Sequence, residues 1–223
     1  TFIMRRGRVR YDKYYEPELD GKFNKDHVEL SDIAMTVRIG LLSKDSTDIT
    51  LKHLSLREKC GLHLRDLQFS MSSNGKGGTL EGMCLSTDNS ELTIPYVRYA
   101  MAARDSNGKV NPCGITAEAS LAADIVPSDI SAFVPQLSHF DRGIHIESGL
   151  SLYDGRLDSK DTKLYDEERD ITYKGDIEVD SLFGNPRISL NVEHLGTSRQ
   201  AQDFIWQNMT GNTDRHIATL DAL

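Results

Sequence analysis

Apolar residues in the first half of the chain recur with one spacing, h-x-h-x-x-h-x-h, where h is apolar and x is any residue. Residues two positions apart share a face of a β-strand, and the three-residue step in the middle breaks that alternation. A strand keeps its apolar face through such a step only if it accommodates an extra residue as a bulge or bend. The pattern therefore predicts four bent strands in a curled sheet. The copies are Val28, Leu30, Ile33, Met35; Ile49, Leu51, Leu54, Leu56; Leu62, Leu64, Leu67, Phe69; and Leu92, Ile94, Val97, Tyr99.

Turn signals and regular alternation extend this prediction over the rest of the chain. Asn74-Gly75 and Asn107-Gly108 lie between apolar runs, where Asn-Gly favours a hairpin because both residues tolerate positive φ. Apolar residues then alternate with polar ones over residues 115–121, 144–152, 171–179 and 188–192. The fold class that follows is mainly β, a curled antiparallel sheet with bulged strands. Its apolar face either lines a U-shaped groove or forms the closed core of a sandwich.

Three further segments interrupt the strand pattern. Ile130, Phe133, Val134 and Leu137 have helical spacing behind Ser128, and predict a short helix at about residues 128–138 that covers one end or edge of the sheet. Thr197 and Gln200 resemble a capping box before a second short helix, whose apolar face comprises Ala201, Phe204 and Ile205. The acidic stretch from Asp154 to Asp170 predicts an exposed loop.

Composition narrows the classes of function. The 223 residues suffice for a single β domain spanning residues 1–223, and no stretch reaches the roughly 18–20 apolar residues of a membrane-spanning helix. The formal net charge of −8 argues against binding to nucleic acid, which requires an excess of Lys and Arg. The odd number of cysteines, Cys60, Cys84 and Cys113, does not fit a disulfide framework.

No catalytic or metal-binding motif survives inspection. His145-x-Glu147 lacks the following P-C-x-x-C of zinc deaminases, and both side chains are expected on the solvent face of a strand. Gly75-x-Gly77-Gly78 lacks the GK[ST] ending of a phosphate loop. We therefore expect a non-catalytic protein without cofactor or metal. A hydrolase whose site assembles from distant residues stays open as a minor alternative.

Several segments of the chain, in order, resemble the AsmA/TamB superfamily, especially the TamB-like proteins of Bacteroidetes-type bacteria. These segments are GRVRYD (Gly7–Asp12), PELDGKFNKDHVELSDI (Pro17–Ile33), LKHLSLREKCGLHLRDLQFSM (Leu51–Met71), LSTDNSELTI (Leu85–Ile94) and SDISAFVPQLSHF (Ser128–Phe140). The resemblance covers roughly residues 5 to 195, and it implies an internal fragment of a very long periplasmic protein anchored in the inner membrane. The implied fold is a U-shaped, taco-like sheet.

The function implied by the resemblance is phospholipid transport between the inner and outer membranes, or help in outer-membrane biogenesis. The implied partners are phospholipid acyl chains and an outer-membrane assembly protein. The candidate lipid-contacting residues are Leu51, Leu54, Leu56, Leu62, Leu64, Leu67, Phe69, Leu92 and Ile94. The alternative is a β-sandwich module that binds a glycan or a protein.

Overall fold

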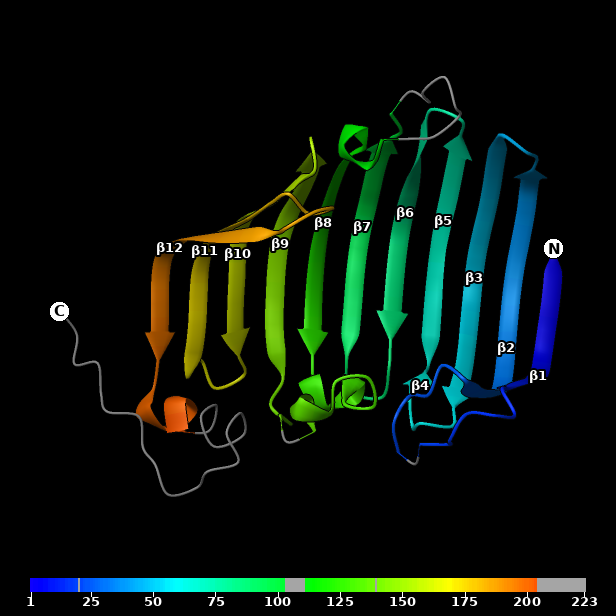
Figure 1. Ribbon diagram of the computed structural model, residues 1–223, viewed down its shortest axis with the longest axis horizontal. Coiled ribbons are helices and arrows are strands. Elements are labelled where there is room, and N and C mark those ends of the chain that lie inside the picture. The colour runs from blue at the N-terminus through cyan, green and yellow to red at the C-terminus, as the bar shows by residue number, and fades with distance from the viewer. Residues whose placement is uncertain (20, 103–110, 139, 204–223) are drawn as a thin grey trace.

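The chain forms one open, antiparallel, twelve-stranded sheet in which nearly every strand pairs with its neighbours in sequence (Figure 1). The computed structural model describes residues 1–19, 21–102, 111–138 and 140–203. The strand order is β1-β2-β3-β5-β6-β7-β8-β9-β10-β11-β12, and the short β4 pairs with β3. The strands are β1 (Phe2–Asp12), β2 (His27–Leu42), β3 (Ser46–Glu58), β4 (His63–Leu64), β5 (Asp66–Asn74), β6 (Gly77–Ser86), β7 (Glu91–Ala100), β8 (Thr116–Ile125), β9 (Ile144–Tyr153), β10 (Arg156–Asp166), β11 (Ile171–Asp180) and β12 (Arg187–Thr197).

The predicted bulges are present where the three-residue steps fall. In β3, Leu51 pairs with Val37 and His53 pairs with Thr36, so Lys52 is the extra residue that keeps Leu51 and Leu54 on one face. In β2, Asp32 takes a positive φ of 51° between Leu30 and Ile33, a conformation that Asp tolerates better than most residues. The first, second and fourth copies of the pattern lie in β2, β3 and β7. The third is divided, because the strand breaks between β4 and β5.

The second half of the sheet contains similar irregularities that the sequence pattern did not reveal. The segment expected to be an acidic loop is mostly strand β10, so that prediction is wrong. An extra residue, Asp161, separates Ser159 from Thr162 in β10, and another, Glu193, shifts the register of β12 against β11. Figure 1 shows the upper parts of β10, β11 and β12 bent sharply away from their lower parts.

The bend in β10–β12 closes toward the apolar face. Thr162 and Gly175 are opposite each other on that face, and both are buried, as is Ser148 of β9. A position on the inside of a bend has little room for a side chain, so small residues belong there. A Cβ at Gly175 would lie 2.2 Å from the carbonyl oxygen of Asn191. The small, buried residues therefore indicate that the apolar face is the inner face of the curl.

The sandwich alternative does not describe this molecule. The strands form one sheet, and no second sheet packs on it anywhere in the described ranges. Besides Pro127, only four apolar side chains in those ranges are buried: Ile33, Leu51, Ala123 and Ala201. The rest of the apolar face is half-buried or exposed, as expected for a single layer.

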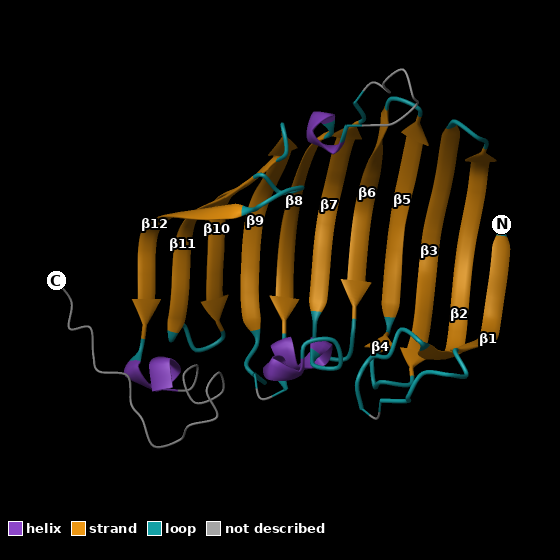
Figure 2. Ribbon diagram, viewed as in Figure 1, coloured by secondary structure: helices purple, strands orange, loops and turns teal. Residues whose placement is uncertain are grey.

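The helical segments differ from the prediction in kind and place. Residues 128–138 form two 3-10 turns, Pro127–Ile130 and Pro135–Leu137, rather than one helix, because Pro135 cannot continue a helix that begins before it. Ile130, Phe133 and Val134 are 39–45% exposed, so the expected burial of this face is wrong. Figure 2 shows these turns at one end of the strands.

The second predicted helix is present at residues 199–203. Its N-cap is Ser198, whose Oγ accepts a hydrogen bond from the backbone N–H of Ala201, rather than Thr197. Ala201 is fully buried, while Phe204 and Ile205 lie outside the described residues, as do Asn107 and Gly108. The hairpin predicted at Asn74-Gly75 joins β5 to β6, with Asn74 opposite Gly77.

Candidate functional site

The apolar face of the sheet is the candidate site, because one row of apolar residues runs across nearly every strand. Leu51 lies opposite Phe69, and Leu67 lies opposite Leu85, which in turn lies opposite Leu92. This register places eight of the nine candidate residues on the same face: Leu51, Leu54, Leu56, Leu64, Leu67, Phe69, Leu92 and Ile94. Leu62 immediately precedes β4. Their contact with lipid stays a prediction.

Exposure of this face is greatest on the two edge strands, β1 and β12. Leu51 is 7% exposed, whereas the other eight candidates are half-buried. On edge strand β12, Ile188 and Leu190 are 70% and 60% exposed. An exposed apolar area of this extent is unusual for the surface of a soluble monomer and is typical of a binding surface.

Strand β8 contributes residues that the sequence reasoning did not select. Ala117, Ala119, Leu121 and Ala123 alternate on the apolar face of β8. Ala117 lies between the larger Tyr99 of β7 and Leu152 of β9, and these three residues line a hollow of about 540 Å³. Small residues flanked by large ones could have been recognised from the regular alternation over residues 115–121.

A cluster of hydroxyl groups interrupts the apolar face in β9 and β10. The Oγ atoms of Ser148 and Ser159 are 2.6 Å apart, and Thr162 Oγ1 lies 3.0 and 2.8 Å from them. Because the three hydroxyls bond to one another, they remove the cost of burying unpaired polar groups. This cluster explains why the strand pattern was missed here, since hydroxyl-bearing residues occupy positions that are apolar elsewhere.

The loop between β1 and β2 crosses one end of the sheet. The backbone N–H of Phe23 donates to the carbonyl oxygen of Ala132, 2.9 Å away, and the rings of Phe23 and Phe133 are 4.8 Å apart. Ala132 and Phe133 belong to the β8–β9 connection, so this contact bridges the strands between β2 and β8. We call residues 13–19 and 21–26 the strap.

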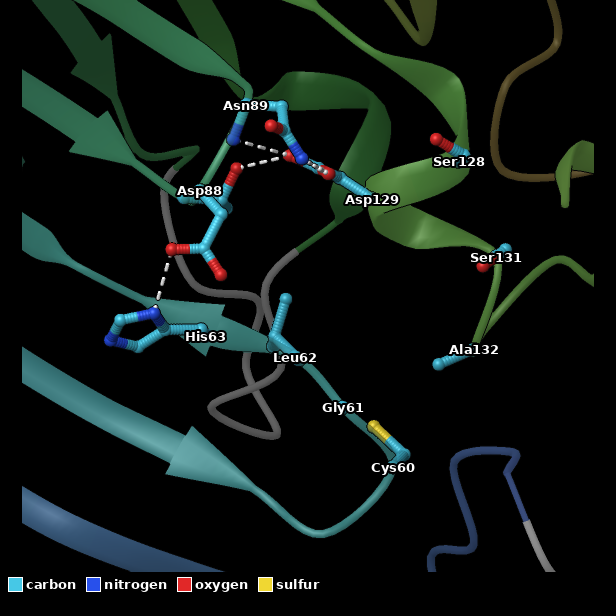
Figure 3. Close-up of a pocket in the computed structure, with 11 residues that line it drawn as sticks. Cys60, Gly61, Leu62, His63, Asp88, Asn89, Ser128, Asp129, Ser131 and Ala132 are labelled. Carbon is cyan, nitrogen blue, oxygen red and sulfur yellow. Dashed lines mark hydrogen bonds and ion pairs between the residues drawn. The ribbon is translucent and has the colours of Figure 1, made fainter. Parts of the chain in front are cut away.

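A cavity of about 300 Å³ lies at the same end of the sheet, between the β3–β4 turn, the β6–β7 turn and residues 128–132 (Figure 3). Its polar groups are mostly engaged: His63 Nδ1 pairs with Asp88, and the carboxylate of Asp129 accepts hydrogen bonds from Thr87, Asn89 and Ser90. Burial opposes ionisation of Asp129, but these hydrogen bonds outweigh burial and lower its pKa. Asp129 thus fastens residues 127–130 to the β6–β7 turn.

His27 holds the strap against the sheet, and this contact is expected to depend on pH. Its Nδ1 lies 2.5 Å from Asp12 and its Nε2 lies 2.7 Å from the carbonyl oxygen of Glu16, so both nitrogens donate only when the ring is protonated. The hydrogen bond to Asp12, then that to Glu16, raises the pKa of His27. A raised folded-state pKa stabilises the fold fully below the unfolded value of about 6.5, and this stabilisation is lost as pH rises through the raised value.

Replacing His27 by Gln is therefore expected to lower the Tm at pH 5.5, with a difference from wild type that shrinks as the pH is raised to 9. Asp12→Asn should reduce the same pH dependence, because it removes the main cause of the raised pKa. Thermal unfolding of the three proteins over this range is the measurement. A Tm difference between wild type and His27→Gln that is constant with pH would contradict the assignment.

Neither metal binding nor a membrane-crossing helix is evident in the described ranges. No group of three or more His, Cys, Asp or Glu side chains there is arranged to hold a metal ion. No helix in those ranges has the length and apolar character to cross a bilayer. His145 and Glu147 lie on one face as expected, with His145 bonded to Asp124 at 2.6 Å and stacked on Tyr165.

Comparison of the chain with protein-family models, with curated proteins and with solved structures finds no match.

Proposed function

We propose that the curled sheet is a non-catalytic trough that holds the acyl chains of phospholipids. The observation that carries the proposal is the apolar face, which extends from β1 to β12 without a second layer over it in the described part of the chain. Because the bulges bend the strands near their middles, the trough runs across the strands rather than along them. Eleven strands side by side, about 4.8 Å apart, give it a length of about 48 Å.

The energetics fit acyl chains without any catalytic group. Each buried methylene contributes about 0.8 kcal/mol, so ten methylenes contribute a gross 8 kcal/mol, roughly a micromolar dissociation constant before the costs of binding. Alternating Leu, Ile and Ala side chains provide such a surface. The trough length of about 48 Å exceeds the roughly 30 Å of a bilayer's hydrocarbon core, so more than one lipid fits along it.

The resemblance to the AsmA/TamB superfamily supports the same proposal and extends it. In this proposal the chain is a periplasmic segment of a longer protein anchored in the inner membrane. It moves phospholipid toward the outer membrane or assists outer-membrane biogenesis, with an outer-membrane assembly protein as a partner. The strap and residues 127–137 border one rim of the trough.

Native mass spectrometry after incubation with phosphatidylethanolamine–phosphatidylglycerol vesicles tests the proposal. The repurified chain is expected to carry phospholipid, whereas glycerophosphoethanolamine, which lacks acyl chains, should not bind. Absence of bound phospholipid, or equal binding of glycerophosphoethanolamine, would refute an acyl-chain trough.

A further inference from the structure

The two ends of the strands form the two rims of the trough, and these rims differ in charge. We call the end that the strap crosses the lower rim and the opposite end the upper rim, as they lie in Figure 1. Each rim comprises the connections between strands at that end, with two strand residues on either side, in the described ranges. The lower rim is then residues 11–19, 21–28, 57–67, 85–92, 124–138, 140–145 and 165–172, and the upper rim is residues 41–47, 73–78, 99–102, 111–117, 152–157 and 179–188.

Carboxylates are in large excess at the lower rim. It holds fifteen Asp and Glu residues against eight Lys and Arg, a formal charge of −7, and the carboxylates are spread from Asp12 at the end of β1 to Asp170 before β11. The upper rim holds three Asp against four Lys and Arg, a formal charge of +1. Because exposed charges act over about 8–10 Å at physiological salt, a phosphate meets net repulsion along the lower rim and none at the upper rim.

Two lysines of the upper rim lie in neighbouring turns and are free to bind an anion. Lys44 is in the β2–β3 turn and Lys76 in the β5–β6 turn, and the pairing of Ser46 with Asn74 places these turns side by side. Both side chains are exposed, and neither forms an ion pair with a described residue. The backbone of the second turn is fixed, because the N–H of Lys76 donates to Asn74 Oδ1 at 2.8 Å and its carbonyl oxygen accepts from the N–H of Met101 at 2.8 Å. Two unpaired ammonium groups above one stretch of the sheet are suited to a phosphate.

The apolar face begins below these turns. Ile39, Ile49 and Met71 lie opposite one another across β2, β3 and β5, and Ile39 is 48% exposed. Lys76 and Tyr99 line one hollow of about 380 Å³, and Tyr99 belongs to the apolar face. Cationic groups above an apolar surface match a phospholipid, in which a phosphate is joined to acyl chains.

We propose that phospholipids lie in the trough with their phosphate groups at the upper rim, against Lys44 and Lys76, and with their acyl chains directed toward the bends. This orientation rests on the proposed acyl-chain trough and adds a fixed direction to it. A strand of ten residues is about 33 Å long, and the acyl chains of one leaflet span about 15 Å, half of the hydrocarbon core of a bilayer. Chains that start at the upper rim therefore end near the middle of the strands, where the register shifts of β3 and β7 lie.

The lower rim supplies a matched control. Lys22 and Lys25 of the strap are exposed and form no ion pair with a described residue, so they resemble Lys44 and Lys76 except in the charge of their rim. Lys44→Gln/Lys76→Gln and Lys22→Gln/Lys25→Gln make the same change in charge at opposite rims. Because all four side chains are exposed, both double variants are expected to keep the β spectrum of the wild type.

Photo-capture of two lipids with the same acyl chains tests the proposal. Phosphatidylglycerol and diacylglycerol, each with a photo-crosslinking group in one acyl chain, are added at the same trace level to phosphatidylcholine vesicles, so that the vesicle surface carries almost no net charge. Wild type is expected to capture phosphatidylglycerol about five- to tenfold more strongly than diacylglycerol, because two charge pairs form only with the phosphate. Lys44→Gln/Lys76→Gln should lose this preference, and Lys22→Gln/Lys25→Gln should keep it.

The outcomes separate the orientation from the trough. Equal capture of both lipids by wild type would overturn the orientation, as would a preference that survives in Lys44→Gln/Lys76→Gln or is lost in Lys22→Gln/Lys25→Gln. Capture of neither lipid by wild type would overturn the trough itself.

The position of the headgroup is tested separately by a phospholipid that carries the crosslinking group next to its phosphate. Peptide mapping is expected to find the label in residues 41–47 or 73–78 of the wild-type chain. Label confined to the lower rim, for example to residues 124–132, would contradict the orientation even where capture through the acyl chain is strong.

Discussion

Replacing Gly175 by Ala is expected to destabilise the fold by about 1–3 kcal/mol, the usual cost of forcing extra atoms into a packed position. The added Cβ would lie 2.2 Å from the backbone carbonyl oxygen of Asn191 and 2.9 Å from the hydroxyl of Tyr173. The tyrosine can move, but Asn191 belongs to the paired backbone of β12. To relieve the clash with Asn191, β11 and β12 would therefore have to separate where the sheet bends.

Gly149 provides the matched control for this substitution. It lies in β9, and a Cβ there would meet only the carbonyl oxygen of Lys160 at an ordinary distance of 3.8 Å. Gly149→Ala should change stability by less than about 0.5 kcal/mol. Urea unfolding of both variants measures the difference. Equal stabilities would show that Gly175 is not confined by the bend, and that the inner face of the curl is assigned wrongly.

The bulged strands of the first half could be predicted because each irregularity leaves a trace in the spacing of apolar residues. The step from Leu51 to Leu54 requires one extra residue, and Lys52 is that residue. No comparable trace exists in β10, where Ser159 and Thr162 occupy the apolar face. The strand tolerates these hydroxyl groups on its apolar face because they form hydrogen bonds with one another. Without an apolar pattern, the sequence predicted an acidic loop here.

The apolar spacing could not distinguish a closed sandwich from an open sheet. Leu51 and Leu64 belong to the same pattern, although Leu51 is 7% exposed and Leu64 is half-buried. That difference arises from how far neighbouring strands crowd each position, which depends on tertiary packing. The position of the strap could not be predicted from the sequence either. Its contact between Phe23 and Ala132 joins residues more than a hundred positions apart.

Replacing Leu64 by Asp is expected to leave the chain folded while weakening lipid capture by about tenfold or more. Leu64 is half-buried on an open face, so a carboxylate there can stay hydrated. The same carboxylate in place of Leu51, which is 7% exposed, would be buried without a partner at a cost of several kcal/mol. Against a typical stability of about 5–15 kcal/mol, that variant should unfold or fail to accumulate.

Circular dichroism separates these outcomes before any lipid is added. Leu64→Asp should keep the β spectrum and a cooperative unfolding transition, whereas Leu51→Asp should lose both. If Leu64→Asp also unfolds, the position lies in a closed core and the open-face assignment fails there. Lys52→Asp, at an exposed position in β3, makes the net charge more negative by two, against one for Leu64→Asp, and serves as the control for added negative charge.

The trough is tested most directly by the capture of a phospholipid that carries a photo-crosslinking group in its acyl chain, compared between wild type and the folded Leu64→Asp variant. An acyl-chain trough predicts strong capture by wild type and by Lys52→Asp, and a loss of about tenfold or more with Leu64→Asp, since one charge replaces a side chain worth several methylenes of contact. Unchanged capture by folded Leu64→Asp would contradict the trough at this position, and absence of capture by wild type would contradict it altogether.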